Sequence, residues 1–116
     1  MPTSEGFRFG DVVVVPFPYA DKLAEKRRPA LVVSSPDLSR LGVIWVVMIT
    51  SASHRGWACD VPIDDVAPTG LSSASVVRPA KIACIDPDRV IRRAGAVSER
   101  IASRVREQIS RFLVEG

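Results

Sequence analysis

The sequence predicts a mainly β fold with a C-terminal helix (α+β), in which a small twisted β-barrel is closed by the helix. Short apolar, β-branched runs recur along the first 96 residues, and Pro, Gly, Asp and Ser separate them. The apolar spacing then changes to that of a helix. At 116 residues, the chain is expected to form one domain that spans residues 1–116.

The composition narrows the class of protein. Hydrophobic residues make up 47% of the chain and charged residues 25%, as in folded soluble domains. No apolar run is long enough for a membrane span and no signal peptide is apparent, so a cytoplasmic location is expected. Cys59 and Cys84 lack a CxxC or histidine partner. They are therefore expected to be buried free thiols, and neither a metal site nor a cofactor is expected.

The first predicted strand covers residues 11–16, where Val12 to Val15 suit a buried pleated surface. A polar loop follows at 19–26. Pro29 restricts the residue before it to an extended backbone and so marks the start of a second strand at 29–34. Arg28 would then lie at the mouth of this strand, beneath a mobile loop, where it could meet an anion.

The middle of the chain predicts several further short elements. A single turn is expected at 37–41, and the near-continuous apolar run at 43–50 predicts a strand buried on both faces, with Trp45 in the core. Pro62 marks a further candidate, at 57–63, as an edge strand or a strand end. Two alternatives remain for 75–85, namely two short strands or one strand broken at Pro79. A turn at 86–88 and a last strand at 90–96 complete the β part.

The C-terminal segment has a helical pattern. Ser98 is a suitable N-cap, and Glu99 suits the positive end of the helix dipole. Five apolar residues then follow at helical spacing and predict one buried face, namely Ile101, Val105, Ile109, Phe112 and Leu113.

Four motifs in order resemble the MazF/PemK family, the ribonuclease toxins of toxin–antitoxin operons. The first two are GDVVVVPFP at residues 10–18 and KRRPALVVS at 26–34. The others are MITS at 48–51, and GL at 70–71 followed by SVVRPAKI at 75–82. Each motif alone is weak, but together they cover most of the chain. The resemblance implies an SH3-like barrel of the MazF/PemK/CcdB type.

The resemblance also implies a function and partners. The expected function is that of the toxin of a type II toxin–antitoxin system, a metal-independent, sequence-specific endoribonuclease that cleaves single-stranded RNA. The substrate's 2′-OH would attack the neighbouring phosphorus and leave 2′,3′-cyclic phosphate and 5′-OH ends. A homodimer whose interface lines the RNA groove, and a cognate antitoxin protein, are the implied protein partners.

Three residues are predicted to be catalytic. The guanidinium of Arg28 can grip a phosphate through two hydrogen bonds and stabilise its developing charge, although a surface arginine beside a proline is an equally ordinary interpretation. Thr50 could hydrogen-bond the phosphate or leaving oxygen, or simply satisfy a strand end. The resemblance implies function for both, and for Arg78, which precedes Pro79. Many relatives carry an acidic residue two positions later, where this chain has Ala80.

Further residues are predicted to contact RNA. Arg27 would contact a phosphate or simply be solvated, Lys81 would contact RNA, and aromatic side chains could stack on unpaired bases. Trp57 and Phe17 could stack in this way, but for both of them core packing or a dimer contact is at least as reasonable. His54, the single histidine, and Glu25 are both expected to be solvated rather than catalytic. The remaining predicted RNA contacts are Lys26, Ser51, Phe17 and Tyr19.

Two alternative functions remain open at the level of sequence. A relative of the same fold poisons DNA gyrase without catalysis and depends on its terminal helix. The missing acidic residue at Ala80 also makes a non-catalytic RNA-binding or antitoxin-binding homologue credible. In that case RNA should bind with salt-sensitive affinity but stay intact.

Overall fold

A computed structural model describes residues 6–17, 26–53 and 56–114. Within these residues, six strands, two α-helices and two short 3-10 helices follow one another. The order is β1 (Asp11–Phe17), β2 (Lys26–Val32), α1 (Pro36–Arg40), β3 (Ile44–Ser51), β4 (Val61–Ile63), η3 (Ala67–Thr69), β5 (Ser75–Ile85), η4 (Pro87–Arg89), β6 (Arg92–Ala96) and α2 (Glu99–Val114).

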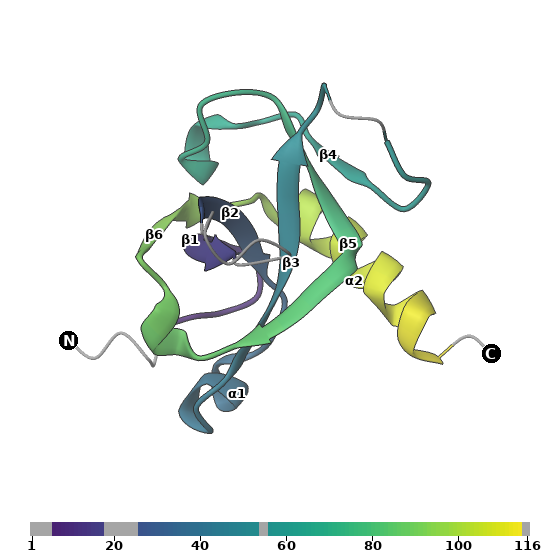
Figure 1. The fold of residues 1–116 in the computed structure, drawn as a ribbon. Helices are drawn as coiled ribbons and strands as arrows, with labels where there is room; N and C mark the ends of the chain where they lie inside the picture. The colour runs from purple at the N-terminus through teal and green to yellow at the C-terminus, as the bar shows by residue number, and fades with distance from the viewer. Residues whose placement is uncertain (1–5, 18–25, 54–55, 115–116) are drawn as a thin grey trace.

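All six strands form one antiparallel sheet in the order β4-β5-β3-β2-β1-β6. The sheet curls into a half-barrel, and α2 packs beside β4 and β5 (Figure 1). The predicted fold class is therefore confirmed.

Each face of the sheet has its own apolar core. The helix-side core joins strand residues such as Leu31, Val47 and Val77 to Ile101 and Val105 of α2, all fully buried. The Phe7-side core lies on the opposite face and gathers Phe7, Val13, Val15, Ala30, Val32, Ile44 and Val46. Along β1, β2 and β3, side chains point alternately to these two cores, so both faces of the valine run in β1 are apolar.

Close backbone contacts bring the two ends of the curled sheet together. The segment η3, which follows the edge strand β4, packs against β6 at the other edge (Figure 1). A Cβ atom at Gly95 would lie 2.2 Å from the carbonyl oxygen of Pro68, and one at Gly70 would lie 2.3 Å from that of Ala94. Only glycine permits this approach. Thr69 is fully buried between them, and its hydroxyl donates to the Val66 carbonyl at 2.6 Å.

The second strand starts earlier than predicted. β2 begins at Lys26, so Arg28 and Pro29 lie within the hairpin, opposite Val15 and Val14 of β1. The pairing of β2 with β3 extends only over Ala30 to Val32. Pro29 therefore lies where β2 is paired on its β1 side alone, and its missing N–H costs no hydrogen bond to β3.

Two predictions about the later strands are settled by the structure. β5 is a single strand, but its register with β3 jumps from Val47↔Ile82 to Met48↔Arg78. Pro79, Ala80 and Lys81 form the bulge between these pairs, which is where a proline is tolerated. β4 is shorter than the predicted 57–63, because residues 57–60 form a turn in which the Asp60 N–H donates to the Trp57 carbonyl at 3.0 Å.

The predicted burial of Trp45 is wrong. Trp45 is 42% exposed and pairs with Cys84, which is also exposed, so the expected burial of this thiol is wrong too. Trp45 lies instead over an open hollow that it lines with Leu38 and Leu41. Cys59 is partly buried, and both cysteines are free.

The terminal helix begins as predicted. The Ser98 hydroxyl accepts the N–H of Ile101 at 3.3 Å, which is the expected N-cap bond. The apolar face is buried only in its first half, however. Phe112 and Leu113 are 53% and 72% exposed, because α2 continues beyond the strands that it covers.

Candidate functional site

The strand register brings the three predicted catalytic residues to one face of the sheet. Ala30, Met48 and Arg78 lie opposite one another across β2, β3 and β5. Arg28 is two residues before Ala30, and Thr50 is two residues after Met48. Residues two apart on a strand point to the same side. All three predicted residues therefore share the side of the Phe7-side core, at its end near the β3 C-terminus.

Arg28 and Thr50 are accessible at this end. Both side chains are partly exposed, whereas Ala30, Leu31 and Val32 further along β2 are fully buried. Neighbouring positions on the same face are apolar, including Val13 and Val15. The arrangement offers a charged donor and a hydroxyl above an apolar floor, which is suited to binding an anion at a partly desolvated surface.

Arg78 lies deeper than the other two and is held by a carboxylate. Its Nε donates to Oδ1 of Asp60 at 3.0 Å, and one terminal nitrogen donates to Oδ2 at 2.9 Å. The two side chains are only 9% and 8% exposed. Burial tends to raise the pKa of Asp60, but hydrogen bonds from Arg78 and from the Trp57 N–H outweigh it, so the pKa of this carboxyl is lowered. The hydrogen bond to Asp60 raises the pKa of Arg78.

Trp57 covers the same corner of the site. The guanidinium carbon of Arg78 lies 4.6 Å from the centre of its indole ring, and the Lys81 ammonium lies 5.6 Å from it. The indole is 44% exposed, so it is not a core residue. These cation–π contacts link the bulge of β5 to the turn before β4.

The other predicted RNA contacts are not all on this face. Arg27 alternates with Arg28 and points to the opposite side of β2, where it is exposed. Ser51 alternates in the same way with Thr50, and its hydroxyl accepts the N–H of Ser53 at 3.2 Å. Lys81 is exposed beside Trp57. Tyr19, Glu25 and His54 lie outside the described residues. Phe17 and Lys26 belong to β1 and β2, but only their backbone is described.

Among the described residues, Asp60 contacts a predicted catalytic residue but was not selected from the sequence. It lies 18 residues before Arg78 and belongs to none of the four motifs. An available signal was the spacing Trp57-x-x-Asp60, since aspartate commonly closes a turn by accepting a nearby backbone N–H. The Trp57 N–H does donate to Asp60 Oδ2, at 2.9 Å.

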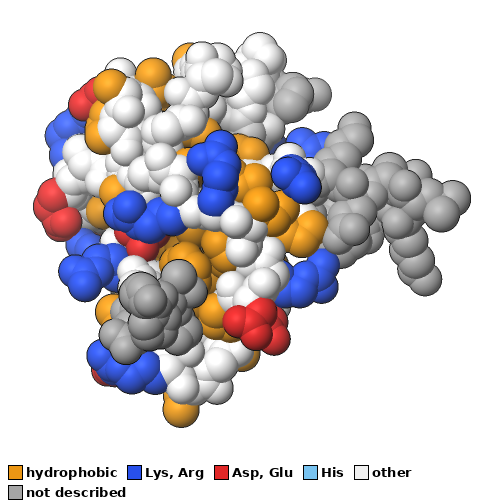
Figure 2. Space-filling view, turned by 90° about the vertical axis from the view of Figure 1, so that its left-hand side faces the viewer, with side chains coloured by type: hydrophobic (Ala, Val, Ile, Leu, Met, Phe, Trp, Pro, Cys, Tyr) orange, Lys and Arg blue, Asp and Glu red, His pale blue; other side chains and the backbone are white. Residues whose placement is uncertain are grey.

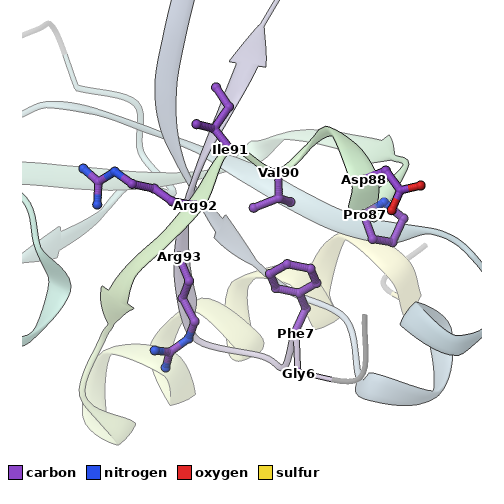
Figure 3. A pocket seen from close by; sticks show the side chains of 8 residues that line it. All are labelled: Gly6, Phe7, Pro87, Asp88, Val90, Ile91, Arg92 and Arg93. Carbon is purple, nitrogen blue, oxygen red and sulfur yellow. The ribbon is translucent and has the colours of Figure 1, made fainter. Parts of the chain in front are cut away.

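A separate hollow lies at the β6 edge and has a volume of about 380 Å³. It contains none of the predicted catalytic residues. Figure 3 shows Phe7, Val90 and Pro87 on one side of it, with the guanidinium groups of Arg92 and Arg93 pointing away. On this side of the molecule, basic side chains surround an apolar strip (Figure 2). Arg93 lies 3.1 Å from the buried Asp11 carboxylate, so it helps to hold β6 on β1.

Neither metal-binding nor membrane-spanning features occur in the described ranges. No group of three His, Cys, Asp or Glu side chains there could hold a metal ion. Neither helix, over the residues described, has the length and hydrophobicity needed to span a bilayer.

Solved structures share this fold. MazF from Deinococcus radiodurans superposes with a TM-score of 0.72 at 24% identity, over 91% of this chain and 94% of that one. The Mycobacterium tuberculosis toxin MazF-mt6 superposes with a TM-score of 0.69 at 24% identity, over 89% of this chain and 95% of that one. An endoribonuclease from a mycobacterial species, solved in complex with its cognate antitoxin, superposes with a TM-score of 0.74 at 19% identity, over 95% of this chain and 96% of that one.

Sequence comparisons give the family. A comparison with curated protein sequences found no significant match. The family model described as the PemK-like, MazF-like toxin of type II toxin–antitoxin systems matches residues 8–113, which include every strand and nearly all of α2. The chain therefore belongs to the PemK-like, MazF-like family of type II toxins.

Proposed function

We propose that this protein is an endoribonuclease toxin that cleaves single-stranded RNA at specific sequences without a metal ion. The single observation behind this proposal is the register that gathers Arg28, Thr50 and Arg78 on one face. The net charge of +3 is compatible with a polyanionic substrate. The solved relative that is an endoribonuclease supports the same reaction class.

The chemistry proposed for the site is an in-line attack of the substrate's 2′-OH on the neighbouring phosphorus. The 2′-OH loses its proton to solvent water as the 2′-O–P bond forms, and the P–O5′ bond breaks. The 5′-oxygen takes up a proton from water, so the products carry 2′,3′-cyclic phosphate and 5′-OH ends. Arg28 stabilises the negative charge that builds on the phosphoryl oxygens, and Thr50 orients the phosphate by a hydrogen bond. Arg78 adds a second positive charge. No arginine acts as the base, because a guanidinium stays protonated.

The proposed partners are single-stranded RNA, a second copy of the chain and a cognate antitoxin. Antitoxin binding is supported by the mycobacterial endoribonuclease and by the Deinococcus radiodurans MazF, both solved in complex with antitoxins. We place the protein in the cytoplasm, where such RNA is found, and treat residues 1–116 as one toxin domain.

The test is cleavage of a long unstructured RNA by the purified protein in EDTA, with cut sites and end groups mapped. Discrete cuts with 2′,3′-cyclic phosphate and 5′-OH ends are expected. Arg28→Ala should lower the cleavage rate by about 100- to 1,000-fold, because it removes a charge-stabilising donor. Thr50→Ala should lower it by about 10- to 100-fold, the worth of one hydrogen bond to a charged group.

A matched control separates loss of chemistry from loss of charge. Arg111→Ala removes the same charge from an exposed position in the last turn of α2 and should cleave like the parent. If Arg28→Ala and Thr50→Ala also cleave like the parent, the proposed site is wrong.

RNA that binds but stays intact would instead favour the binding-only alternative raised by Ala80. Trapped gyrase–DNA complexes would favour the gyrase poison.

A further inference from the structure

We infer that Asp60 is a positioning residue for RNA cleavage, which holds Arg78 on the face shared with Arg28 and Thr50. This inference rests on the proposed function and deepens it. The turn before β4, which lies outside all four sequence motifs, thereby gains a role in the site.

The hydrogen bonds fix the guanidinium in two directions. Asp60 binds the side of Arg78 through Nε and one terminal nitrogen, at 3.0 and 2.9 Å, which restrains both the plane and the direction of the fork. This bidentate contact uses two of the five N–H donors of an arginine. Both partners are less than 10% exposed, so solvent does not screen the contact.

The carboxylate itself is restrained from a second side. Asp60 Oδ2 accepts the Trp57 N–H at 2.9 Å, while the Asp60 N–H donates to the Trp57 carbonyl at 3.0 Å. The Trp57 ring then lies 4.6 Å from the Arg78 guanidinium. Carboxylate, backbone turn and indole therefore form a closed unit around one side chain. Rigid support of this kind keeps a functional group within the tolerance that catalysis needs.

The position of Arg78 explains why it needs such support. It is the last paired residue before the bulge at Pro79, Ala80 and Lys81, where β5 loses its register with β3. Bulges re-aim side chains and weaken the ladder that would otherwise fix them. Ala80 offers no acidic group to anchor the arginine locally. The anchor comes instead from the neighbouring strand's entry turn.

A second aspartate–arginine pair provides the contrast. Asp64 accepts two hydrogen bonds from one terminal nitrogen of Arg100, at 2.8 and 2.9 Å, but these side chains are 59% and 58% exposed. An exposed pair of this kind holds its partner weakly. Asp64→Asn is therefore a matched control that removes a hydrogen-bonded carboxylate from the same segment and should leave cleavage unchanged.

The experiment measures single-turnover cleavage rate and RNA affinity separately, on variants whose circular dichroism matches the parent. Asp60→Asn should cleave about 100-fold more slowly while its affinity for an uncleavable 2′-deoxy analogue stays within about 3-fold. Asp60→Glu keeps the charge, so it serves as the variant expected to fold. Its extra methylene moves the carboxylate by about 1.5 Å and should slow cleavage about tenfold.

Each outcome bears on the inference. A purely structural role predicts that folded Asp60→Asn and Asp60→Glu cleave at the parental rate, and that result overturns it. An equal loss of affinity and rate also overturns it, because Asp60 would then serve binding. If the parent protein cleaves no RNA, the proposed function fails and this inference fails with it. A parent that cleaves, with variants that do not slow, rejects the role of Asp60 alone.

Discussion

At the residue scale, the buried contact between Asp60 and Arg78 links the site to the stability of the fold. Breaking a buried ion pair by removing one partner leaves an uncompensated charge, which typically costs about 3–5 kcal/mol of unfolding free energy. Asp60 accepts three hydrogen bonds, two from Arg78 and one from the Trp57 backbone. Removal of its charge should therefore destabilise the protein as well as disturb the site.

The pH dependence of this contribution follows from the lowered pKa of Asp60. Burial acts to raise it, but the Arg78 and Trp57 hydrogen bonds act more strongly. In the unfolded chain the carboxyl returns to a pKa of about 4. The unfolded state therefore takes up a proton first as the pH falls. The stabilisation from Asp60 is complete above about pH 4 and is lost as the pH falls through the folded-state pKa.

Urea unfolding from pH 7 to pH 3 tests this linkage. At pH 7, Asp60→Asn should lower the free energy of unfolding by about 3–5 kcal/mol, and the gap to the parent should narrow below about pH 4. Asp64→Asn, which removes an exposed pair, should stay close to the parent at pH 7. A gap between Asp60→Asn and the parent that stays constant down to pH 3 would contradict the assignment.

The sequence alone could identify part of this site and not the rest. Arg28, Thr50 and Arg78 each belong to a local motif, so a local pattern was sufficient to select them as candidates. Asp60 was missed because its importance depends on Arg78, 18 residues away on the neighbouring strand. The spacing Trp57-x-x-Asp60 signals a turn, but nothing in the local sequence identifies Arg78 as the partner of Asp60. The structure was also needed to show that Arg27 and Ser51 alternate away from the shared face.

At the element scale, the two ends of the curled sheet meet through backbone contacts that only glycine permits. Gly95→Ala would place a Cβ 2.2 Å from the Pro68 carbonyl oxygen and 2.7 Å from the Thr69 carbonyl carbon. Since backbone atoms cannot swing aside as a flexible side chain can, η3 and β6 must separate. We expect a loss of about 3 kcal/mol in unfolding free energy, measured by urea unfolding.

A second glycine supplies the comparison for this prediction. Gly42 has a φ of +101°, but no atom lies within 4 Å of the position that a Cβ would occupy, so Gly42→Ala tests backbone strain without a clash. Gly42→Ala should lower the free energy of unfolding by about 1–2 kcal/mol. A smaller loss for Gly95→Ala than for Gly42→Ala would show that η3 and β6 adjust easily, against the closure described above.

The elements also show where sequence patterns are reliable. The six strands and the terminal helix follow the predicted order, because β-branched runs and helical spacing are local properties. The prolines show where local patterns stop being sufficient: the predicted start of β2 at Pro29 is three residues late, and of the two alternatives at Pro79 the structure shows one strand interrupted by a bulge. Both prolines lie inside strands, one where pairing is one-sided and the other in a bulge. Whether a missing N–H matters depends on the neighbouring strand, which the local sequence does not reveal.

At the scale of the whole molecule, the two faces of the sheet differ in how their apolar cores are covered. The helix-side core is covered by the first half of α2, where Ile101 and Val105 are fully buried. The Phe7-side core ends in the accessible face of Arg28 and Thr50. The exposure of Phe112 and Leu113 could not be read from hydrophobicity, because it depends on how far α2 extends past the sheet. Trp45 is exposed for another reason, since it lies over the open hollow that it lines with Leu38 and Leu41.

The molecule's basic character gives the last prediction, which concerns where RNA binds. Single-stranded RNA releases counterions when Lys or Arg side chains contact its phosphates. A plot of log affinity against log salt concentration should therefore have a negative slope, of about 0.7 for each phosphate contacted. Lys81 is exposed beside Trp57, at the corner of the site. Lys81→Ala should therefore reduce the salt slope by about 0.7 and weaken binding alike for all sequences.

Arg40→Ala removes the same charge from a different place. Arg40 lies in α1, where it pairs with Asp37, and Figure 1 shows α1 at the far end of the molecule from β4. Fluorescence anisotropy with an uncleavable RNA analogue, over a range of salt concentrations, measures both slopes. The slope of Arg40→Ala should match the parent, because a charge beyond a Debye length of about 10 Å is largely screened. If both variants lower the slope equally, RNA responds to the overall charge, and the corner around Trp57 and Lys81 is not a binding surface.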